Sequence, residues 1–155
     1  SCYKNCSEIK MKIYIGSDHA GYELKEKLKK YLGEFDYEVI DKGAFEYKEF
    51  DDYPDYVEPV ANSVVEDEGS FGIVIGGSGE GEAMDANRTI GARACEFYGG
   101  NLDVVKVSRE HNDANILSLG ARFVTEEEAK KAVDIFINTK FSGDERHIRR
   151  IEKLD

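Results

Sequence analysis

The chain has 155 residues, of which 41% are hydrophobic and 34% are charged, a balance typical of one globular domain with a single core. Its formal net charge of −11 argues against binding to nucleic acid or to an anionic membrane, because the field of the whole chain repels such partners. No stretch is apolar over the roughly 20 residues that span a bilayer, and no secretory signal is visible, so we expect a cytoplasmic protein.

The three cysteines, Cys2, Cys6 and Cys95, are too few and too uneven in number for a disulfide framework. The first two lie in residues 1–10, which we interpret as a polar N-terminal extension or a cloning remnant. No second pair of ligands with zinc spacing follows them, so no metal site is predicted. Cys95 lies in a strand-like run and is expected to be a small buried hydrophobe.

From residue 11 to residue 155 we expect one domain, whose first half alternates short apolar runs with amphipathic ones. A strand at 12–16 is followed by a helix at 21–32, where apolar residues recur at helical spacing, and by a strand at 37–41. A long acidic and aromatic loop, 43–53, leads to a helix that Pro54 is well placed to begin.

The second half continues the alternation. The run at 71–76 is apolar at nearly every position, as in a central parallel strand buried on both faces, and a short helix starts near Glu82. The remaining predicted elements are a strand at 91–97, a helix at 101–110, a strand at 114–120, a helix capped by Thr125 with three acids in its first turn, and a tail helix with Ser142 as its cap. Five strands alternating with helices predict an α/β fold, a doubly wound parallel sheet with helices on both faces.

Ligands bind such sheets beyond the carboxyl ends of the strands. Four segments are expected there: SDHAG at 17–21, GGSGEGEA at 76–83, REHN at 109–112 and GAR at 120–122. The glycine-rich segment is neither a P-loop nor a dinucleotide fingerprint, since Met84 occupies the last glycine position of the latter. It offers backbone N–H groups and the Ser78 hydroxyl to an oxyanion, although its glycines also suit tight strand-to-helix packing.

The other candidates have structural alternatives as well. Asp18 suits a helix N-cap, His19 a solvated first turn, and His111 a helix C-terminus. Arg146 and Arg150 share a helical face by their i, i+4 spacing. Their guanidinium groups are suited to clamp a phosphate, but neighbouring glutamates offer an exposed ion-paired face instead.

Taken together, SDHAG, GGSG-G-E, HNDAN-L-LGAR and the tail RH-RRI resemble, in order and spacing, the type B ribose-5-phosphate isomerases and the related isomerases of allose and galactose 6-phosphates. The resemblance extends from Met11 to about Leu154. It implies a Rossmann-like three-layer fold, a homodimer or homotetramer with active sites shared between subunits, and neither a metal nor another cofactor.

One departure from the family concerns the catalytic base. Many members carry a cysteine at the end of the third strand, where this chain has Gly76, whereas a second branch uses the glutamate of G-G-S-G-x-G-E, which matches Glu82. Isomerisation of an aldose to a ketose moves a proton between C2 and C1 through a cis-enediolate, and one carboxylate can serve both carbons. The resemblance therefore implies that Glu82 is the base.

Further roles follow from the same resemblance. Ser78 and the loop N–H groups would hold the enediolate oxygen, and His111 would open the sugar ring with help from Asp18. The matched phosphate positions are His19, Arg122, Arg146 and Arg150. Tyr53 and Asn112 match positions that contact the substrate. The loop glycines that would line the substrate are Gly77, Gly79 and Gly81.

The sequence thus predicts an aldose–ketose isomerase that interconverts D-ribose 5-phosphate and D-ribulose 5-phosphate in the pentose phosphate pathway. Two alternatives stay open. The first is the same chemistry on allose 6-phosphate, galactose 6-phosphate or a tetrose phosphate, because the pocket depends on the partner subunit and on loop 43–53. The second is a non-catalytic protein that binds a sugar phosphate or a nucleotide, for which the missing cysteine is the main argument.

Overall fold

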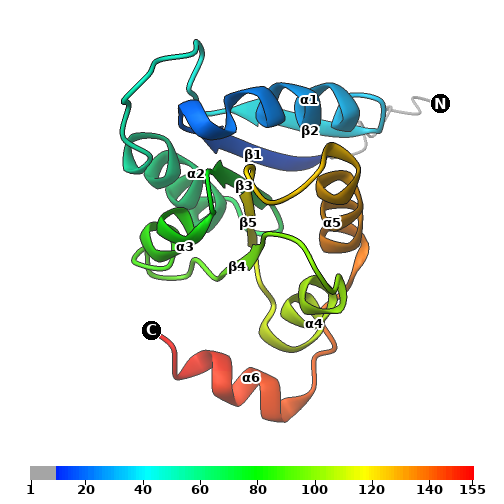
Figure 1. The fold of residues 1–155 in the computed structure, drawn as a ribbon. Coiled ribbons are helices and arrows are strands. Elements are labelled where there is room, and N and C mark those ends of the chain that lie inside the picture. The colour runs from blue at the N-terminus through cyan, green and yellow to red at the C-terminus, as the bar shows by residue number, and fades with distance from the viewer. Residues whose placement is uncertain (1–9) are drawn as a thin grey trace, which may run out of the picture.

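The computed structural model describes residues 10–155, so Cys2, Cys6 and all but the last residue of the expected extension lie outside the described part. Five parallel strands form one sheet in the order β2-β1-β3-β5-β4. Along the chain they are β1 Met11–Ser17, β2 Tyr37–Asp41, β3 Phe71–Gly76, β4 Ala94–Phe97 and β5 Ile116–Gly120. Helices cover both faces of this sheet (Figure 1), which confirms the predicted α/β fold.

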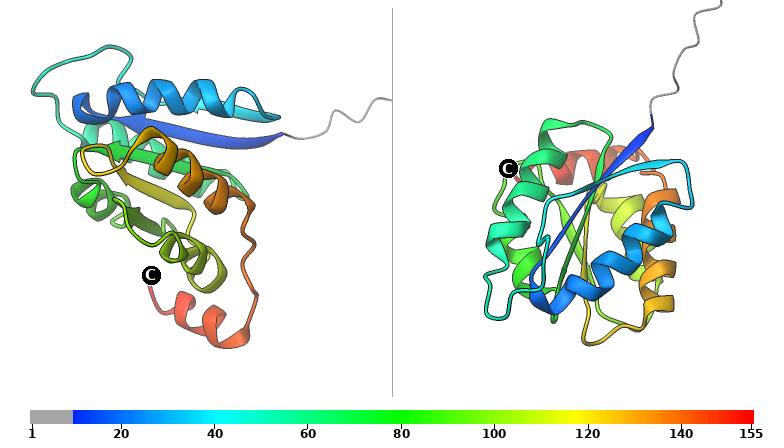
Figure 2. Two further views of the ribbon diagram at one scale, coloured as in Figure 1. Left: turned by 45° about the vertical axis from the view of Figure 1, so that its right-hand side comes forward. Right: turned by 90° about the horizontal axis from the view of Figure 1, so that it is seen from above.

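The helices divide between the two faces of the sheet (Figure 2). They are the 3-10 turn η1 His19–Gly21 and helices α1 Tyr22–Leu32, α2 Pro54–Glu66, α3 Glu80–Ala86, α4 Asp103–Asn112, α5 Glu126–Asn138 and α6 Glu145–Glu152. Apolar side chains of α1, α4 and α5 pack on one face, and those of α2 and α3 pack on the other. This division makes the three layers of the fold.

Strand β3 is the centre of the core, as its apolar sequence predicts. All six of its residues are buried. Ile73 and Ile75 belong to the cluster under α1, α4 and α5, whereas Val74 belongs to the cluster under α2 and α3, which is the alternation of a strand covered on both faces. Cys95 on β4 packs against the first cluster, and burial raises the pKa of its thiol to about 11, in keeping with a structural cysteine.

Several element boundaries follow the predicted chemistry. Pro54 begins α2, and the Thr125 hydroxyl accepts a hydrogen bond from the Glu128 N–H at 3.1 Å in a complete capping box. The cap of α6 was predicted wrongly. Gly143 has a φ of 74°, so the helix begins beyond it with Asp144 at the N-cap, and Ser142 accepts a hydrogen bond from the Asp144 N–H instead.

Residues 109–112 do not lie at the carboxyl ends of the strands, contrary to expectation. They form the last turn of α4, which returns the chain to the amino end of β5. The Arg109 guanidinium lies 4.7 Å from the ring centre of Phe71, the first residue of β3. The ends of a six-residue strand are about 16 Å apart, so His111 and Asn112 lie at the edge of the sheet opposite Gly76.

Across residues 10–155 every helix is too short or too polar to cross a membrane.

Candidate active site

The candidate site forms where β1, β3 and β5 end side by side. The sheet order reverses between β1 and β3, because β1 is followed by β2 on one side and the rest of the chain crosses to the other. Ligands of open α/β sheets bind at such a switch point. Two backbone hydrogen bonds, from Ala121 N–H to the Gly76 carbonyl at 2.8 Å and from Arg122 N–H to the Gly77 carbonyl at 3.0 Å, hold two of the predicted segments together.

The loop between β3 and α3 is fixed by its own hydrogen bonds. Gly79 has a φ of 83°, a conformation that favours glycine, and its carbonyl accepts a hydrogen bond from the buried Ser118 hydroxyl at 2.6 Å. Ser78 accepts the Glu80 N–H at 3.2 Å. This bond uses the Ser78 oxygen as an acceptor, so its O–H remains to donate to a ligand.

Glu82 lies in the first turn of α3 with only 4% of its surface exposed. Its carboxylate rests against the backbone of Gly76 so closely that a Cβ atom at position 76 would overlap it. Burial raises the pKa of Glu82, the charge of Asp18 raises it further, and hydrogen bonds from the N–H groups of Glu82 and Gly79 oppose both effects. A buried carboxylate with a raised pKa at the end of a central strand is suited to take up a proton.

Two more loop glycines contact predicted site residues. A Cβ at Gly77 would lie 3.1 Å from Nη1 of Arg122, and a Cβ at Gly81 would lie 2.6 Å from Cζ of Tyr53. The structure therefore brings Arg122 from the end of β5 and Tyr53 from the loop before α2 onto the same glycine-rich backbone as Glu82. Gly76, Gly77 and Gly81 thus leave room for the side chains of Glu82, Arg122 and Tyr53, respectively.

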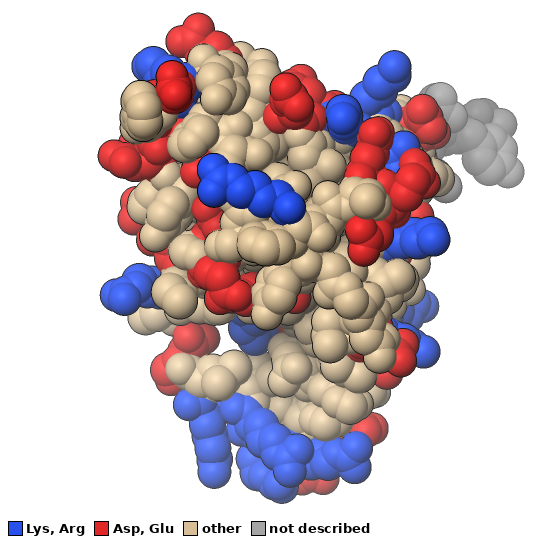
Figure 3. Space-filling view, in the orientation of Figure 1, with Lys and Arg blue, Asp and Glu red and all other residues tan. Residues whose placement is uncertain are grey.

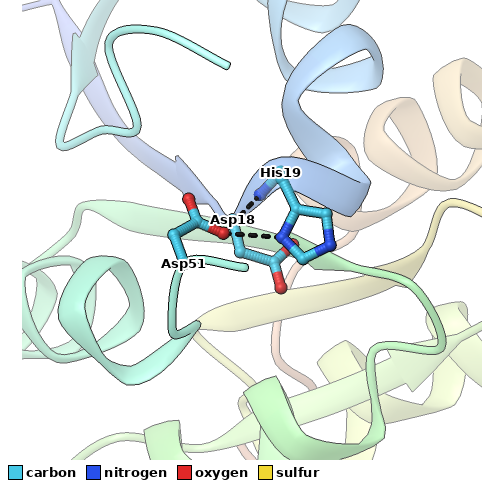
Figure 4. Close-up of side chains that lie close together, drawn as sticks. All are labelled: Asp18, His19 and Asp51. Atoms are coloured by element: carbon cyan, nitrogen blue, oxygen red, sulfur yellow. Dashed lines mark hydrogen bonds and ion pairs between the residues drawn. The ribbon is translucent and has the colours of Figure 1, made fainter. Parts of the chain in front are cut away.

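Asp18 and His19 follow β1 at the same edge of the sheet (Figure 4). Asp18 is 7% exposed and accepts the Ala20 N–H at 3.0 Å, so it is a cap as expected. Burial and the charge of Asp51 raise the pKa of Asp18, against the opposing effect of His19. Asp18 and Glu82 are thus two buried acids with raised pKa values, and the charge of Asp18 contributes to the shift of Glu82.

Asp51 is a site residue that the sequence did not single out. One carboxylate oxygen of Asp51 accepts a hydrogen bond from the backbone N–H of His19 at 2.9 Å. The same oxygen lies 2.7 Å from Nδ1 of the His19 imidazole (Figure 4). This pairing places a proton on Nδ1 and fixes the orientation of the imidazole, which leaves Nε2 for a ligand. No sequence signal distinguishes Asp51 from Asp52 and Asp55, because all three lie in one acidic segment.

Asp18, His19 and Asp51 also form a cluster whose ligand atoms lie within 4.8 Å of one another, as a metal site requires. The hydrogen bonds between His19 and Asp51 account for most of this closeness. They occupy Nδ1 of the imidazole and one carboxylate oxygen, so the cluster does not by itself indicate a metal ion.

A second pair of carboxyls lies beside Glu82. Burial raises the pKa of Glu96 on β4 to about 7, as do a hydrogen bond with Glu80 and the charges of Glu80 and Glu82. Glu80 occupies the first turn of α3, where the helix dipole favours an acid.

The other predicted residues, His111, Asn112, Arg146 and Arg150, lie on α4 and α6. The imidazoles of His111 and His147 are stacked, with ring centres 4.4 Å apart, and the Glu110 carbonyl accepts the Ser142 N–H at 3.1 Å. These contacts hold α6 beside the end of α4, away from the glycine-rich loop (Figure 1, Figure 2). The exposed α6 arginines, Arg146, Arg149 and Arg150, belong to a basic patch at that end of the molecule (Figure 3).

The predicted site residues therefore form two groups at opposite edges of the sheet. We call Asp18, His19, Tyr53, Ser78, Glu82 and Arg122 the loop group, and His111, Asn112, Arg146 and Arg150 the helix group. The two groups do not meet within one chain.

A buried carboxylate with a raised pKa, set beside the Ser78 hydroxyl at the switch point of a parallel sheet, defines the class: an α/β protein with a candidate site for a small ligand. The family model for ribose/galactose isomerases matches residues 13–154. The chain belongs to this family.

Relatives with known names support the same placement. The chain is 42% identical over 144 residues to ribose-5-phosphate isomerase B of Mycobacterium leprae, covering 93% of this chain and 88% of that protein. The structure of a ribose 5-phosphate isomerase from Thermotoga maritima is 44% identical, with a TM-score of 0.87 over 94% of this chain and 97% of that one. The ribose-5-phosphate isomerase B of Mycoplasma genitalium, solved with bound ribulose-5-phosphate, is 36% identical, with a TM-score of 0.89 over 95% of both chains.

Proposed function

We propose that this protein interconverts D-ribose 5-phosphate and D-ribulose 5-phosphate, as an enzyme of the pentose phosphate pathway in the cytoplasm. The observation that carries the proposal is the buried Glu82 carboxylate beside the Ser78 loop. It provides a base and oxyanion donors in a chain whose relatives are named for this reaction.

In the proposed mechanism Glu82 removes the proton from C2 of the open-chain aldose. The electrons of the C2–H bond form a C1–C2 double bond, and the C1 carbonyl oxygen takes the negative charge of the enediolate. The Ser78 hydroxyl and loop N–H groups stabilise that oxygen. Glu82 returns the proton to C1 while the C2 oxygen becomes the ketose carbonyl, and the proton of the C2 hydroxyl passes to the C1 oxygen, so atoms and charge balance.

Substrate binding needs both groups of residues. In the loop group, His19 and Arg122 bind phosphate, Tyr53 contacts the sugar, and Asp18 assists at its ring oxygen. In the helix group, His111 opens the furanose ring, Asn112 contacts the sugar and Arg146 and Arg150 bind phosphate. A five-carbon sugar phosphate cannot bridge the two edges of one sheet, about 16 Å apart, so we propose that a second copy supplies the helix group in a homodimer or homotetramer.

The substrate is tested by assaying pentose, hexose and tetrose phosphates for aldose–ketose conversion. We expect the highest kcat/KM with ribose 5-phosphate. A clear preference for a hexose or tetrose phosphate would contradict the proposed substrate without contradicting the chemistry, and binding without conversion would contradict both.

The base is tested by Glu82→Gln, which keeps the shape of the side chain. Turnover should fall by about 10²–10⁴-fold, the usual contribution of a general base, while ribose 5-phosphate still binds. Glu80→Gln is the matched control, because Glu80 lies in the same turn of α3 but its carboxyl group is hydrogen-bonded to that of Glu96. A Glu82→Gln enzyme as active as the Glu80→Gln enzyme would rule out Glu82 as the base.

A further inference from the structure

We propose that Gly76 is a positioning residue for Glu82: its missing side chain forms the notch that holds the Glu82 carboxylate in its buried place. The inference rests on the proposed role of Glu82 as the base. It adds that the position of this base depends on a glycine that has no reactive group of its own.

The geometry of the contact is specific. A Cβ atom at position 76 would overlap Oε1 and Cδ of Glu82 and would lie 2.5 Å from Oε2. The carboxylate at the end of the Glu82 side chain, with all three of its heavy atoms, occupies the volume of the absent side chain. At Gly77, in contrast, the nearest atoms are at 3.1 Å and belong to the flexible guanidinium of Arg122.

Gly76 is not explained by its backbone conformation. Gly79 and Gly91 have positive φ values, but Gly76 is the last residue of β3 and lies in the parallel ladder opposite Gly120. Glycine weakens a strand relative to alanine, and it commonly marks a close approach of another group. Glu82 is the group that approaches here.

The backbones of Gly76 and Glu82 are both held by hydrogen bonds. The Gly76 carbonyl accepts the Ala121 N–H at 2.8 Å, which ties this end of β3 to the segment after β5. The Glu82 backbone belongs to the first turn of α3, where the Gly79 carbonyl accepts the Ala83 N–H at 3.1 Å. A side chain at position 76 would therefore displace the carboxylate of Glu82 rather than the backbone of either element.

Displacement would change the reaction in a recognisable way. The carboxylate would leave the end of β3 and gain contact with water, so the burial that raises the pKa of Glu82 would be relieved. Phosphate contacts made by His19 and Arg122 would remain. We therefore expect a loss of kcat with little change in KM, which a general loss of structure would not produce.

The first test is Gly76→Ala, with Gly33→Ala as the matched control, because Gly33 lies at the exposed end of α1 with a right-handed φ of −65°. Gly76→Ala should lower kcat by about 100-fold or more, close to the Glu82→Gln level, and leave KM within about twofold. The remaining activity should persist to lower pH than in the wild type. Wild-type kcat in Gly76→Ala would overturn the inference.

The second test does not need activity and stays informative if Gly76→Ala folds poorly. Gly76→Ala should lower the melting temperature when Glu82 is present, but much less in a Glu82→Ala background, where the overlapping carboxylate is gone. Equal losses in both backgrounds would overturn the inference. If the proposed base is wrong but the notch is real, Glu82→Gln will be active while this coupling in melting temperature remains.

Discussion

At the scale of single residues, the candidate site is distinguished by two buried acids, Asp18 and Glu82. Burial is the main cause of the raised pKa of both Asp18 and Glu82, and each is also raised by a neighbouring carboxylate. A base whose pKa lies above its ordinary value holds a proton more readily. The arrangement therefore suits a group that must take a proton and return it.

The first prediction concerns the pH dependence of turnover. Glu82 must be ionised to act as the base, so kcat should fall as the pH is lowered through its raised pKa. Asp18→Asn removes a negative charge that raises the pKa of Glu82, so this pKa should fall. The midpoint of the acid limb of the kcat–pH profile should then move to lower pH, even if the variant is slower at every pH. A midpoint that stays in place or moves up would show that Glu82 does not control this limb.

The second prediction concerns the Asp51 carboxylate that orients His19. Asp51→Asn replaces a charge-assisted hydrogen bond with a weaker one, so KM for ribose 5-phosphate should rise by roughly tenfold while kcat changes little. Steady-state kinetics measures both quantities. Asp55→Asn, an exposed neighbour in the first turn of α2, is the control. Equal KM values in the two variants would mean that His19 does not need Asp51.

At the scale of helices and strands, the sequence predicts what local chemistry determines. The apolar run of β3, the proline that begins α2 and the capping box of α5 all lie where expected, because each depends on residues close in the chain. The predicted start of the fourth strand at residue 91 is too early. Gly91 has a φ of 89°, and the Arg93 N–H donates to the Asn115 side chain instead of a strand neighbour, which no local pattern reveals.

The residues of the candidate site also differ in how far the sequence predicts their positions. Residues directly after β1, β3 and β5 were predictable, because the carboxyl ends of parallel strands meet at one edge. The expected position of His111 was wrong, because α4 leads into β5 and its last residues therefore lie at the amino ends of the parallel strands. The role of Asp51 depends on a contact with His19, which is distant in sequence. The notch at Gly76 depends on the shape of the turn between β3 and α3. Neither can be recognised from the sequence pattern.

At the scale of the whole molecule, charge and distance both favour a shared site. The chain carries a net charge of −11, while α6 presents a basic patch far from the loop group (Figure 3). The proposed phosphate-binding role of α6 requires that this helix complete the site of another copy. Neither half would then bind the substrate fully without the other.

The third prediction follows from this division. Glu82→Gln and His111→Ala should each be nearly inactive, but mixed oligomers should regain activity, because one site combines the intact Glu82 of one copy with the intact His111 of the other. Random pairing into dimers would restore about a quarter of the wild-type activity. A mixture no more active than the average of its two components, under conditions where subunits exchange, would contradict a shared site.

The most direct test of the central claim is proton transfer by Glu82 itself. The wild-type protein and Glu82→Gln are incubated with ribose 5-phosphate in deuterated water, and NMR follows deuterium at C1 of ribulose 5-phosphate and at C2 of the recovered aldose. We predict incorporation by the wild type, at a rate that is reduced by about 10²–10⁴-fold in the variant, which still binds the sugar. Incorporation at the wild-type rate by Glu82→Gln, or none by the wild-type protein, would contradict the account.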